Sequence, residues 1–474
     1  MAKLKILFSA SEVAPFAKAG GLADVVGSLP KQLVKMGIEA RVLTPRYEQI
    51  DLKKVKVKKI ASINIPFGHK KYPTTIYETR LPDSKVVVYL LDQETMLSKG
   101  PIYQTKSADK NFLIKRFLFL SFASLYILPK INFQPDIIHA HDWHTASICT
   151  LLSMGHFSNI NFYQNIKTLL TLHNIQHQPK APKTILDFLG LGNTKLNILE
   201  QGIQYSDFLN TVSPQYAKDI KTWAYGYGLE KVIRSRGEKA FGILNGIDTQ
   251  FFNPKTDPSI IKNYSIKNLD DKKNNKKSLQ KELNLPAKET ALIVATVTRL
   301  ATQKGVEFMI QAIGKFKNPN IQFIILGTGS DRYEIALKKL QKKYPKNFSY
   351  TNGFDLNLAS RIYAGADTFM MPSLFEPCGL GQMIAMRYGT LPVVRDTGGL
   401  HDTVTSYNKK KGTGFLFNKS ETQDFINTIR QAEKIYKFPK IWRKLQQNAM
   451  KKDFSWEKSA IKYQSLYNKI IKLN

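Results

Sequence analysis

Two cations stand five residues apart in the segment TRLATQKG, residues 298–305. Arg299 and Lys304 follow the apolar run ALIVATV, which predicts a strand, and Gly305 closes the loop behind them. Two full positive charges at this spacing suit a diphosphate better than a single carboxylate. On spacing alone, a pair of solvated loop charges explains them equally well.

A glycine pair and a cation occur together near the amino terminus, in the segment KAGGL. Gly20 and Gly21 follow Lys18 and precede apolar residues at helical spacing. Such a pair lets backbone N–H groups approach a ligand closely, and the start of a helix favours an anion. An ordinary strand-to-helix turn is the alternative. The segment GTGSDRYE, residues 327–334, repeats this pattern more weakly and is equally consistent with a tight turn.

Three histidines and an aspartate crowd the segment HAHDWH, residues 139–144. A metal site is one reading, but the order of ligands departs from H-x-H-x-D-H and no second cluster completes the set. We therefore predict no metal site. Asp142 and Trp143 are better suited to be a carboxylate and an aromatic platform for a sugar, and His139 is expected to pack in the core. His173, in TLHN, is either a hydrogen-bond donor to a substrate or a satisfied core histidine.

A third group of candidates lies in FEPCGLGQ, residues 375–382. Glu376 stands on a glycine-rich turn, where its carboxylate is placed to hold sugar hydroxyls or to cap the following helix. Cys378 has no histidine near it in sequence, which favours packing over a nucleophilic role.

Strand-like apolar runs alternate with helical patterns along nearly the whole chain, which predicts a parallel α/β architecture. Two series of strands, separated by a Lys/Asn-rich segment at residues 260–286, predict two Rossmann-like domains with a hinge near Gly246. The expected strands are residues 4–9, 39–45, 85–92, 135–141, 167–173 and 208–213, then 291–299, 321–329, 367–373, 391–396 and 412–417.

The candidate residues follow the ends of these strands. Ligands of open α/β sheets bind at the carboxyl ends of the strands, so we expect the candidate segments to meet in one cleft between the two domains. The Lys/Asn-rich segment contains leucines and is predicted to form a surface helix, with a disordered linker as the alternative.

The composition excludes some classes of partner. The 474 residues include 70 Lys and Arg against 37 Asp and Glu, giving a formal net charge of +33. The lysines are scattered and no nucleic-acid-binding motif accompanies them, so solvated faces are expected and nucleic acid is not an expected partner. The apolar stretch at residues 117–128 is too short to span a bilayer and predicts a buried helix, so no membrane partner is expected. Two cysteines and the absence of a signal-peptide pattern predict a cytoplasmic location.

Several of these segments together resemble a known family. KILFSASEVAPFAKAGGLADVVGSLPKQL, HAHDWH, GILNGID, TRLATQKG and MMPSLFEPCGLGQMIAMRYGTLPVVRDTGGLHDTV are similar to bacterial glycogen synthases and plant starch synthases, in order from residue 4 to about 456. The resemblance implies the GT-B fold, in which two Rossmann-like domains face each other across a cleft. It also implies a retaining glucosyltransferase that moves glucose from ADP-glucose to the non-reducing end of an α-1,4-glucan such as glycogen, with no metal or cofactor.

The resemblance also divides the chain. Residues 1–245 correspond to a starch synthase catalytic domain on the acceptor side, and residues 246–456 to a domain that binds the nucleotide sugar. Residues 457–474 are expected to form a helix that packs back on the first domain.

Residue by residue, the resemblance assigns roles at the diphosphate. Lys18, Gly20 and Gly21 match the loop that approaches the sugar diphosphate from the first domain. Arg299 and Lys304 match the pair that neutralises the leaving diphosphate.

Other matches surround the sugar and the base. His173 matches the histidine at the donor glucose, and Asp142 with Trp143 matches the acidic-aromatic pair lining the glucose and acceptor side. Phe354 stands where relatives carry a tyrosine beside the adenine, so it keeps the ring but loses the hydroxyl. The remaining positions expected to contact substrate are Asn245 in GILNGID and Glu376, Cys378, Gly379 and Leu380 in EPCGL.

Alternatives remain open at this point. Among enzymes, the alternative is a nucleotide-sugar epimerase or another GT-B transferase that uses UDP-glucose, since the loops do not exclude UDP. A non-catalytic glucan- or RNA-binding protein on the same fold is the alternative from a different class.

Overall fold

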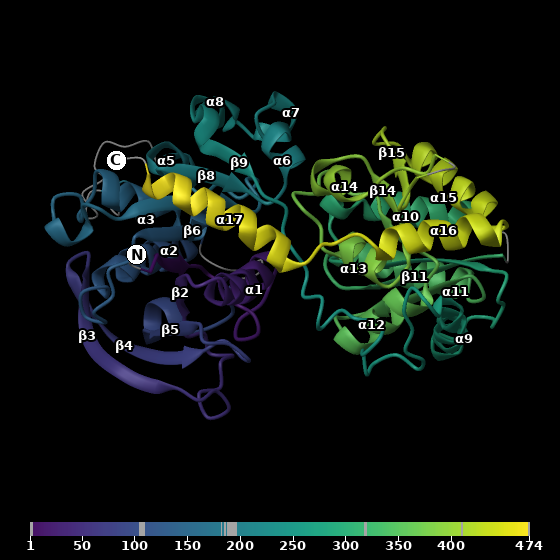
Figure 1. Cartoon of the computed structure of the whole chain (residues 1–474), viewed down its shortest axis with the longest axis horizontal. Helices are drawn as coiled ribbons and strands as arrows, with labels where there is room; N and C mark the ends of the chain where they lie inside the picture. Colours follow the sequence, from purple (N-terminus) through teal and green to yellow (C-terminus); the bar gives the residue numbers. More distant parts are fainter. Residues whose placement is uncertain are drawn as a thin grey trace. The chain divides into compact units, whose positions relative to one another are not determined.

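The chain folds into two compact units. The computed structural model describes residues 3–103, 110–181, 183, 186, 197–316, 320–408 and 411–472. The N-terminal unit consists of Met1–Asn245 together with Trp456–Asn474, and the C-terminal unit is Gly246–Ser455. Figure 1 shows the carboxyl-terminal helix α17 (Trp456–Ile471) lying beside α1 of the N-terminal unit.

A single mixed sheet runs through the described part of the N-terminal unit, in the order β3-β4-β5-β2-β1-β6-β7-β8-β9. The strands from β5 to β9 in this order are parallel, and β3, β4 and β5 are joined as antiparallel neighbours. Their bounds are β1 Lys5–Ser9, β2 Glu39–Pro45, β3 Lys58–Phe67, β4 Lys70–Arg80, β5 Val87–Asp92, β6 Ile137–His141, β7 Lys167–Leu172, β8 Phe208–Thr211 and β9 Ala240–Gly242.

Helices cover both faces of this sheet. The main ones are α1 Gly21–Lys35, α2 Lys110–Tyr126, α3 Asp142–Ser153, α5 Ile198–Tyr205, α6 Pro214–Asp219, α7 Trp223–Gly226 and α8 Glu230–Ser235. Short turns of helix are η1 Glu94–Ser98, η2 Asn161–Tyr163 and η3 Gly237–Lys239. Helix α1 begins where its apolar stripe begins, because Leu22, Val25 and Leu29 fall on one buried face.

The core of the N-terminal unit includes the carboxyl-terminal helix. Trp456, Tyr463 and Tyr467 of α17 are buried in the same apolar cluster as α1 and the strands β1 and β2. Burying these three aromatic rings helps to hold the helix on this unit, since each removes a large apolar area from water. The helix therefore belongs structurally to the first unit, although it is last in sequence.

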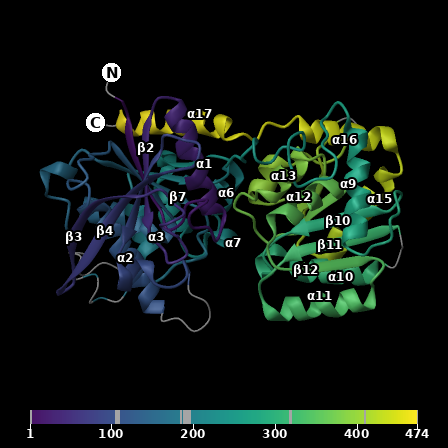
Figure 2. The ribbon, with the colours of Figure 1, turned by 90° about the horizontal axis from the view of Figure 1, so that it is seen from below.

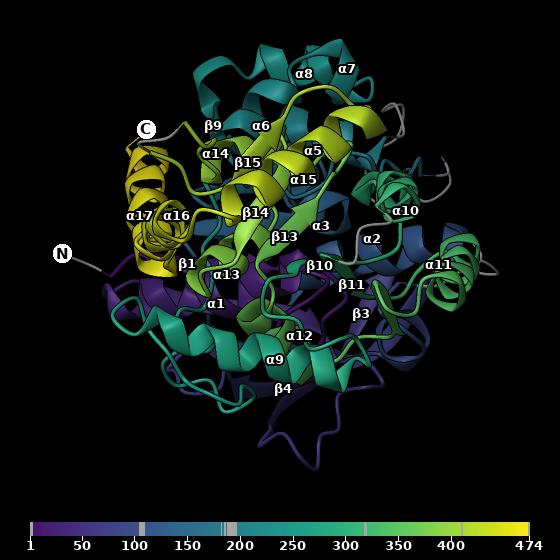
Figure 3. The same cartoon turned by 90° about the vertical axis from the view of Figure 1, so that its right-hand side faces the viewer.

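Six parallel strands form the sheet in the described residues of the C-terminal unit, in the order β12-β11-β10-β13-β14-β15. Figures 2 and 3 show helices on both faces of it, as in a doubly wound fold. The strands are β10 Leu292–Val297, β11 Ile321–Gly327, β12 Phe348–Asn352, β13 Thr368–Met371, β14 Leu391–Arg395 and β15 Phe415–Phe417. The helices are α9 Lys272–Glu282, α10 Val306–Lys315, α11 Asp331–Lys343, α12 Leu356–Gly365, α13 Gly381–Arg387, α14 Gly398–Thr403, α15 Thr422–Tyr436 and α16 Pro439–Met450, with short turns η4 Leu269–Asp271 and η5 Thr302–Lys304.

The predicted strands and the predicted order of elements are confirmed, with four omissions. Strands β3 and β4 were missed because lysines interrupt their apolar pattern and because Pro73 lies inside β4. Strand β12, with the sequence FSYTN, is short and polar at its end, and β9, with the sequence AFG, has only three residues. The apolar stretch 117–128 lies in α2 and the turn after it, and its residues are largely buried as predicted. No helix in the described ranges combines the length and the apolar character needed to cross a membrane.

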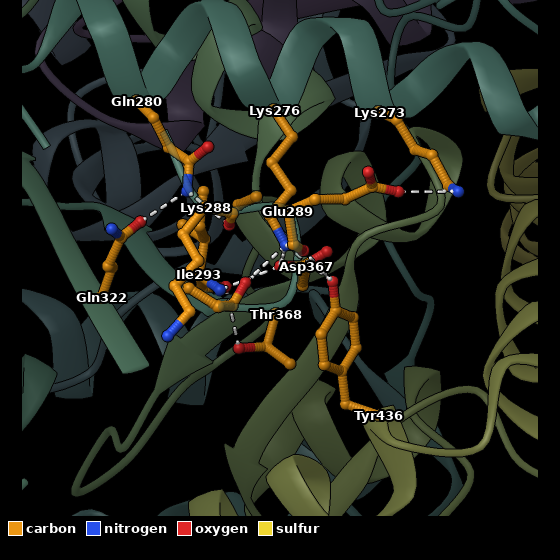
Figure 4. A network of polar contacts seen from close by, with 12 residues as sticks. Lys273, Lys276, Gln280, Lys288, Glu289, Ile293, Gln322, Asp367, Thr368 and Tyr436 are labelled. Atoms are coloured by element: carbon orange, nitrogen blue, oxygen red, sulfur yellow. Dashed lines mark hydrogen bonds and ion pairs between the residues drawn. The ribbon is translucent and has the colours of Figure 1, made fainter. Parts of the chain in front are cut away.

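The Lys/Asn-rich segment forms a helix, but its lysines do not all face water. Lys276 of α9 is buried and donates to Asp367 Oδ2 at 2.7 Å and to the hydroxyl of Tyr436 at 2.6 Å. Figure 4 shows this ammonium surrounded by oxygen acceptors. Asp367 comes just before β13, so the cluster lies at the amino end of this strand, opposite its carboxyl end. Lys272 is also buried, and burial lowers its pKa to about 7. The prediction of a surface helix was therefore wrong for the side of α9 that carries Lys272 and Lys276, because these lysines contact buried acceptors instead of water.

Candidate active site

Three of the candidate segments lie at one edge of the N-terminal sheet. Strands β1, β6 and β7 are parallel neighbours, so the residues that follow them emerge at the same edge. The glycine loop follows β1, Asp142 follows β6, and His173 follows β7. The structure thus brings together candidates that are far apart in sequence.

The glycine loop is held by a carboxylate that the sequence analysis did not single out. The N–H groups of Ala19 and Gly20 donate to Oε2 of Glu12 at 2.5 and 2.7 Å. The hydroxyl of Tyr103 donates to Oε1 of the same side chain at 2.5 Å, and Glu12 is buried. A buried carboxylate with three donors is well satisfied, so it fixes the loop rigidly before α1. The signal in the sequence was an acid between small and apolar residues just after a buried strand.

Lys18 is paired within its own unit. Its ammonium lies 2.6 Å from Oδ1 of Asp24, in the first turn of α1, and the Lys18 side chain remains 41% exposed. Burial raises the pKa of Asp24, and the charge of Lys18 opposes that rise. The pair holds the cation over the start of α1, beside the glycine loop.

Asp142 organises the end of β7. It adopts a left-handed conformation (φ +52°) at the point where β6 passes into α3. Its Oδ1 accepts hydrogen bonds from the backbone N–H groups of His173 at 2.6 Å and of Asn174 at 3.2 Å. Burial raises the pKa of this carboxyl to about 7. Asp142 therefore fixes the backbone that carries His173.

Replacing Asp142 with asparagine tests this reading through pH. The folded pKa of about 7 lies above the ordinary pKa of an aspartic acid, 3.8. A raised folded pKa gives a contribution to stability that is complete below the unfolded pKa and is lost as pH rises through the folded pKa. We expect the wild type to lose about 4 kcal/mol relative to Asp142→Asn between about pH 4 and pH 7. Thermal unfolding midpoints of both proteins across this range measure the difference; a gap that stays constant or changes in the opposite direction would contradict the assignment.

Trp143 and His144 pack inside the unit. Only 8% of Trp143 is exposed, and its ring meets Phe117 edge-on with centroids 5.1 Å apart. His144 packs against both Phe117 and Tyr103. In this structure the Trp143 side chain packs in the core. Its predicted role as an aromatic platform for a sugar stays a prediction.

Three histidine rings stand in contact at this sheet edge. His139 stacks on His141 with centroids 4.3 Å apart, and Nδ1 of His141 lies 3.0 Å from Nε2 of His173. His139 is buried as expected and bonds the hydroxyls of Thr171 and Tyr467. Burial lowers the pKa of His139 and His141 well below the usual range, and that of His173 to about 3. All three rings are therefore neutral at neutral pH.

In the C-terminal unit the structure joins two of the predicted residues directly. The ammonium of Lys304 lies 2.6 Å from Oε2 of Glu376, although 72 positions separate them. The hydroxyl of Ser373 donates to the same carboxylate oxygen at 3.0 Å. Glu376 is 5% exposed and Lys304 is 16% exposed. The two residues meet because Lys304 follows β10 and Glu376 follows β13, which are neighbours in the sheet.

The loop that carries Glu376 is braced from β14. The guanidinium of Arg395 donates from Nε to the carbonyl of Ser373 at 2.7 Å and from Nη2 to that of Leu374. The N–H of Gly399, in α14, donates to the carbonyl of Glu376 at 2.9 Å. These contacts fix the backbone of Glu376. Its carboxylate is engaged by Lys304 and Ser373, and α13 has no side-chain cap, which argues against the helix-capping alternative. Sequence reasoning missed Arg395, because nothing in its local pattern separates a buried arginine from an exposed one.

The remaining candidates of this unit differ in exposure. Arg299 is exposed just beyond β10, and Phe354 is 66% exposed just beyond β12. In EPCGL, Cys378 is buried, Gly379 has a φ of +73°, and Leu380 is half-buried at the start of α13.

Two sequence candidates remain: Asn245 and the glycine segment at residues 327–334. Asn245 is buried at the end of the N-terminal unit, and within the described residues its Oδ1 has no hydrogen-bond partner. The turn after β11 uses its own donors: Gly329 N–H and the Thr328 hydroxyl both donate to Glu334. The tight-turn interpretation of residues 327–334 is therefore favoured.

Comparison with known proteins identifies the family. Residues 5–235 match the starch synthase catalytic domain, and residues 275–451 match the glycosyl transferases group 1. The chain is 41% identical over 483 residues to a glycogen synthase of Desulforamulus reducens, with 99% of each chain covered. It is 42% identical over 486 residues to a glycogen synthase of Clostridium perfringens, again with 99% of each covered. The chain belongs to the glycogen synthase family.

Solved structures agree with this family. The catalytic domain of starch synthase IV from Arabidopsis thaliana, bound to ADP and acarbose, gives a TM-score of 0.91 at 31% identity, covering 99% of this chain and 100% of that one. Sucrose-phosphate synthase from Thermosynechococcus elongatus, at 18% identity and a TM-score of 0.63, shares the fold. The glycogen synthase family member described here is a glycosyltransferase of glycogen or starch synthesis with the GT-B fold, which confirms the resemblance seen in the sequence.

Proposed function

We propose that this enzyme transfers glucose from ADP-glucose to the non-reducing end of an α-1,4-glucan and retains the configuration at the anomeric carbon. The observation that carries the proposal is the buried pair of Lys304 and Glu376, with Arg299 just beyond β10, the strand that Lys304 also follows. The ADP bound to the Arabidopsis starch synthase supports the choice of nucleotide. A cytoplasmic setting remains the prediction from the sequence.

The charges suit the departure of a nucleoside diphosphate. Breaking the glycosidic bond leaves negative charge on ADP and positive charge on the sugar, so fixed cations lower the barrier. Arg299 and Lys304 would stabilise the leaving diphosphate. Glu376 orients Lys304 before substrate arrives and is placed to accept hydrogen bonds from sugar hydroxyls. Because its carboxylate is already engaged by a lysine and a serine, we assign it to orientation rather than to nucleophilic attack.

The proton of the acceptor also needs a destination. In the proposed front-face reaction the acceptor hydroxyl attacks on the side that ADP leaves. The departing phosphate oxygen takes the hydroxyl proton, so no enzyme carboxylate is required as a nucleophile, in contrast to retaining glycosidases. His173, neutral at working pH, would donate a hydrogen bond to the glucose.

The glycine loop would approach the diphosphate from the N-terminal unit. A Cβ added at Gly21 would meet no atom within 4 Å, and one added at Gly20 would meet only Glu12, at 3.8 Å. The fold itself therefore does not demand glycine at Gly21. Space left open beside a helix start and a cation suits an anionic ligand.

Replacing Gly21 with alanine tests whether this glycine is required for binding the sugar nucleotide and not for the stability of the fold. We expect unchanged thermal stability and a KM for the sugar nucleotide raised by about tenfold or more, since a methyl group displaces a closely bound phosphate. Gly27→Ala is the matched control in the same helix, because its Cβ would lie 2.6 Å from the carbonyl oxygen of Ala14. The control should lose about 2 kcal/mol of stability. A normal KM in Gly21→Ala would refute the role of the loop.

A two-donor assay tests the proposed function directly. The enzyme is incubated with glycogen and either ADP-glucose or UDP-glucose, and the released nucleotide is measured. We expect kcat/KM for ADP-glucose to exceed that for UDP-glucose by about tenfold or more. A preference for UDP-glucose would overturn the donor assignment, and salt-sensitive RNA binding without glucosyl transfer would favour the non-catalytic alternative.

A further inference from the structure

We infer that His141 is a positioning residue that sets which ring nitrogen of His173 carries the proton. The inference rests on the proposed function, in which His173 donates a hydrogen bond to the donor glucose. His141 ends β6 and His173 follows β7, the neighbouring strand, so the two rings face each other at the sheet edge. Their contact joins Nδ1 of His141 to Nε2 of His173 at 3.0 Å.

A hydrogen bond between two neutral imidazoles needs one N–H donor and one bare nitrogen. Burial lowers the pKa of both rings, so neither is charged at working pH. Two arrangements are therefore open: either His141 donates from Nδ1, or His173 donates from Nε2. The second nitrogen of the donor ring is then bare, and the second nitrogen of the acceptor ring carries the proton.

The surroundings of His141 decide between the two arrangements. Within the described residues, Nε2 of His141 is buried without a hydrogen-bond partner. If His173 were the donor, the proton of His141 would stand on this isolated nitrogen as an unpaired buried N–H. Among backbone groups, orphaned buried N–H donors are rarer than under-satisfied C=O acceptors, and we extend this preference to the ring nitrogens of His141. His141 therefore carries its proton on Nδ1 and donates it to His173.

The consequence for His173 is direct. Its Nε2 accepts from His141, so its own proton stands on Nδ1. His173 is half-buried, and its Nδ1 makes no hydrogen bond to another described residue. An N–H at that atom is the group that a sugar hydroxyl oxygen needs. With the opposite tautomer, the same atom would be a bare acceptor.

The ring of His141 is held firmly enough to impose this choice. It packs against the ring of His139, at 4.3 Å, and the ring of Phe8, at 5.9 Å between centroids, and these two rings also contact each other. The His141 backbone N–H donates to Oγ1 of Thr145 at 2.7 Å. On the other side, Asp142 fixes the backbone of His173. Both partners of the His141–His173 hydrogen bond are thus oriented before substrate binds.

Two shape-matched variants isolate the hydrogen bond. His141→Asn keeps an N–H donor near the place of Nδ1, whereas His141→Leu has a similar outline and no donor. The first readout is the ¹⁵N spectrum of ¹⁵N-histidine-labelled full-length protein, with the His173 signals identified from a His173→Ala variant. We expect His173 to be protonated on Nδ1 in the wild type and in His141→Asn, and to populate the Nε2-protonated form in His141→Leu.

The second readout is kinetic, with ADP-glucose and glycogen. We expect kcat to fall by about 10- to 100-fold in His141→Leu and by less than about threefold in His141→Asn, with KM for the donor little changed in either. A His173 protonated on Nε2 in the wild type would overturn the inference, even if His141→Leu failed to fold. An unchanged His173 spectrum in a folded His141→Leu would also overturn it. Full turnover in His173→Ala would instead refute the proposed role of His173, and the spectra would still decide whether His141 sets its tautomer.

Discussion

Replacing Lys304 with methionine is expected to lower kcat for glucosyl transfer by about 10²- to 10³-fold, the usual effect of removing one preorganised group that stabilises developing charge. Methionine keeps the length and most of the packing of the lysine stem. The loss should appear mainly in kcat, because charge on the leaving diphosphate grows toward the transition state. Turnover close to that of the wild type would contradict the assignment of Lys304.

The same substitution also lowers the stability of the fold, and this loss has to be separated from the loss of catalysis. Glu376 would lose its cation while remaining 5% exposed, and breaking a buried ion pair costs about 3 kcal/mol or more. The double variant Lys304→Met with Glu376→Gln removes both charges and keeps the Ser373 hydrogen bond. We expect it to recover most of the lost thermal stability without recovering turnover. Recovery of activity in the double variant would mean that Lys304 acts only through the fold.

Replacing Gly305 with alanine is expected to have the second large effect, on the fold around the same site. Gly305 has a φ of +67°, and a Cβ there would lie 2.0 Å from the carbonyl oxygen of Pro372. The carbonyl of Pro372 cannot shift to make room for this Cβ without moving the loop of Glu376, because Pro372 leads directly into that loop. We expect a loss of about 3 kcal/mol or more in stability, measured as a fall in the thermal unfolding midpoint. Since Lys304 is the preceding residue, kcat should also fall by about 10²-fold.

Gly314→Ala is the matched control for this prediction. Gly314 lies in α10 of the same unit, and a Cβ there would meet nothing within 4 Å. Alanine favours the helix over glycine by about 1 kcal/mol, so this control should be neutral or more stable. If both variants behaved alike, the close approach of Gly305 to Pro372 would not matter to the fold.

Much of the fold could be predicted from the sequence, because buried parallel strands are continuous apolar runs with polar residues at their ends. The runs ending before Asp142, His173 and Arg299 were found for this reason. The antiparallel strands β3 and β4 were not, since their lysines and Pro73 resemble a loop. The buried lysines of α9 were also unpredictable, because their acceptors, such as Asp367, lie in distant segments.

In the candidate site, too, the contacts between distant segments could not be predicted from the sequence. Residue types and strand ends located Lys304 and Glu376, but only the adjacency of β10 and β13 joins them in one ion pair. Glu12 and Arg395 were missed because most of their partners are backbone groups of other segments, which residue types alone do not identify. The meeting of the candidate residues of both units in one cleft, and the role of each toward substrate, remain predictions.

A crystal structure of the enzyme with ADP tests the central claim most directly, namely that the C-terminal unit holds the leaving diphosphate on two cations. The account predicts that the phosphate oxygens lie within hydrogen-bond distance of the Arg299 guanidinium and the Lys304 ammonium. A diphosphate seated away from both side chains would contradict it.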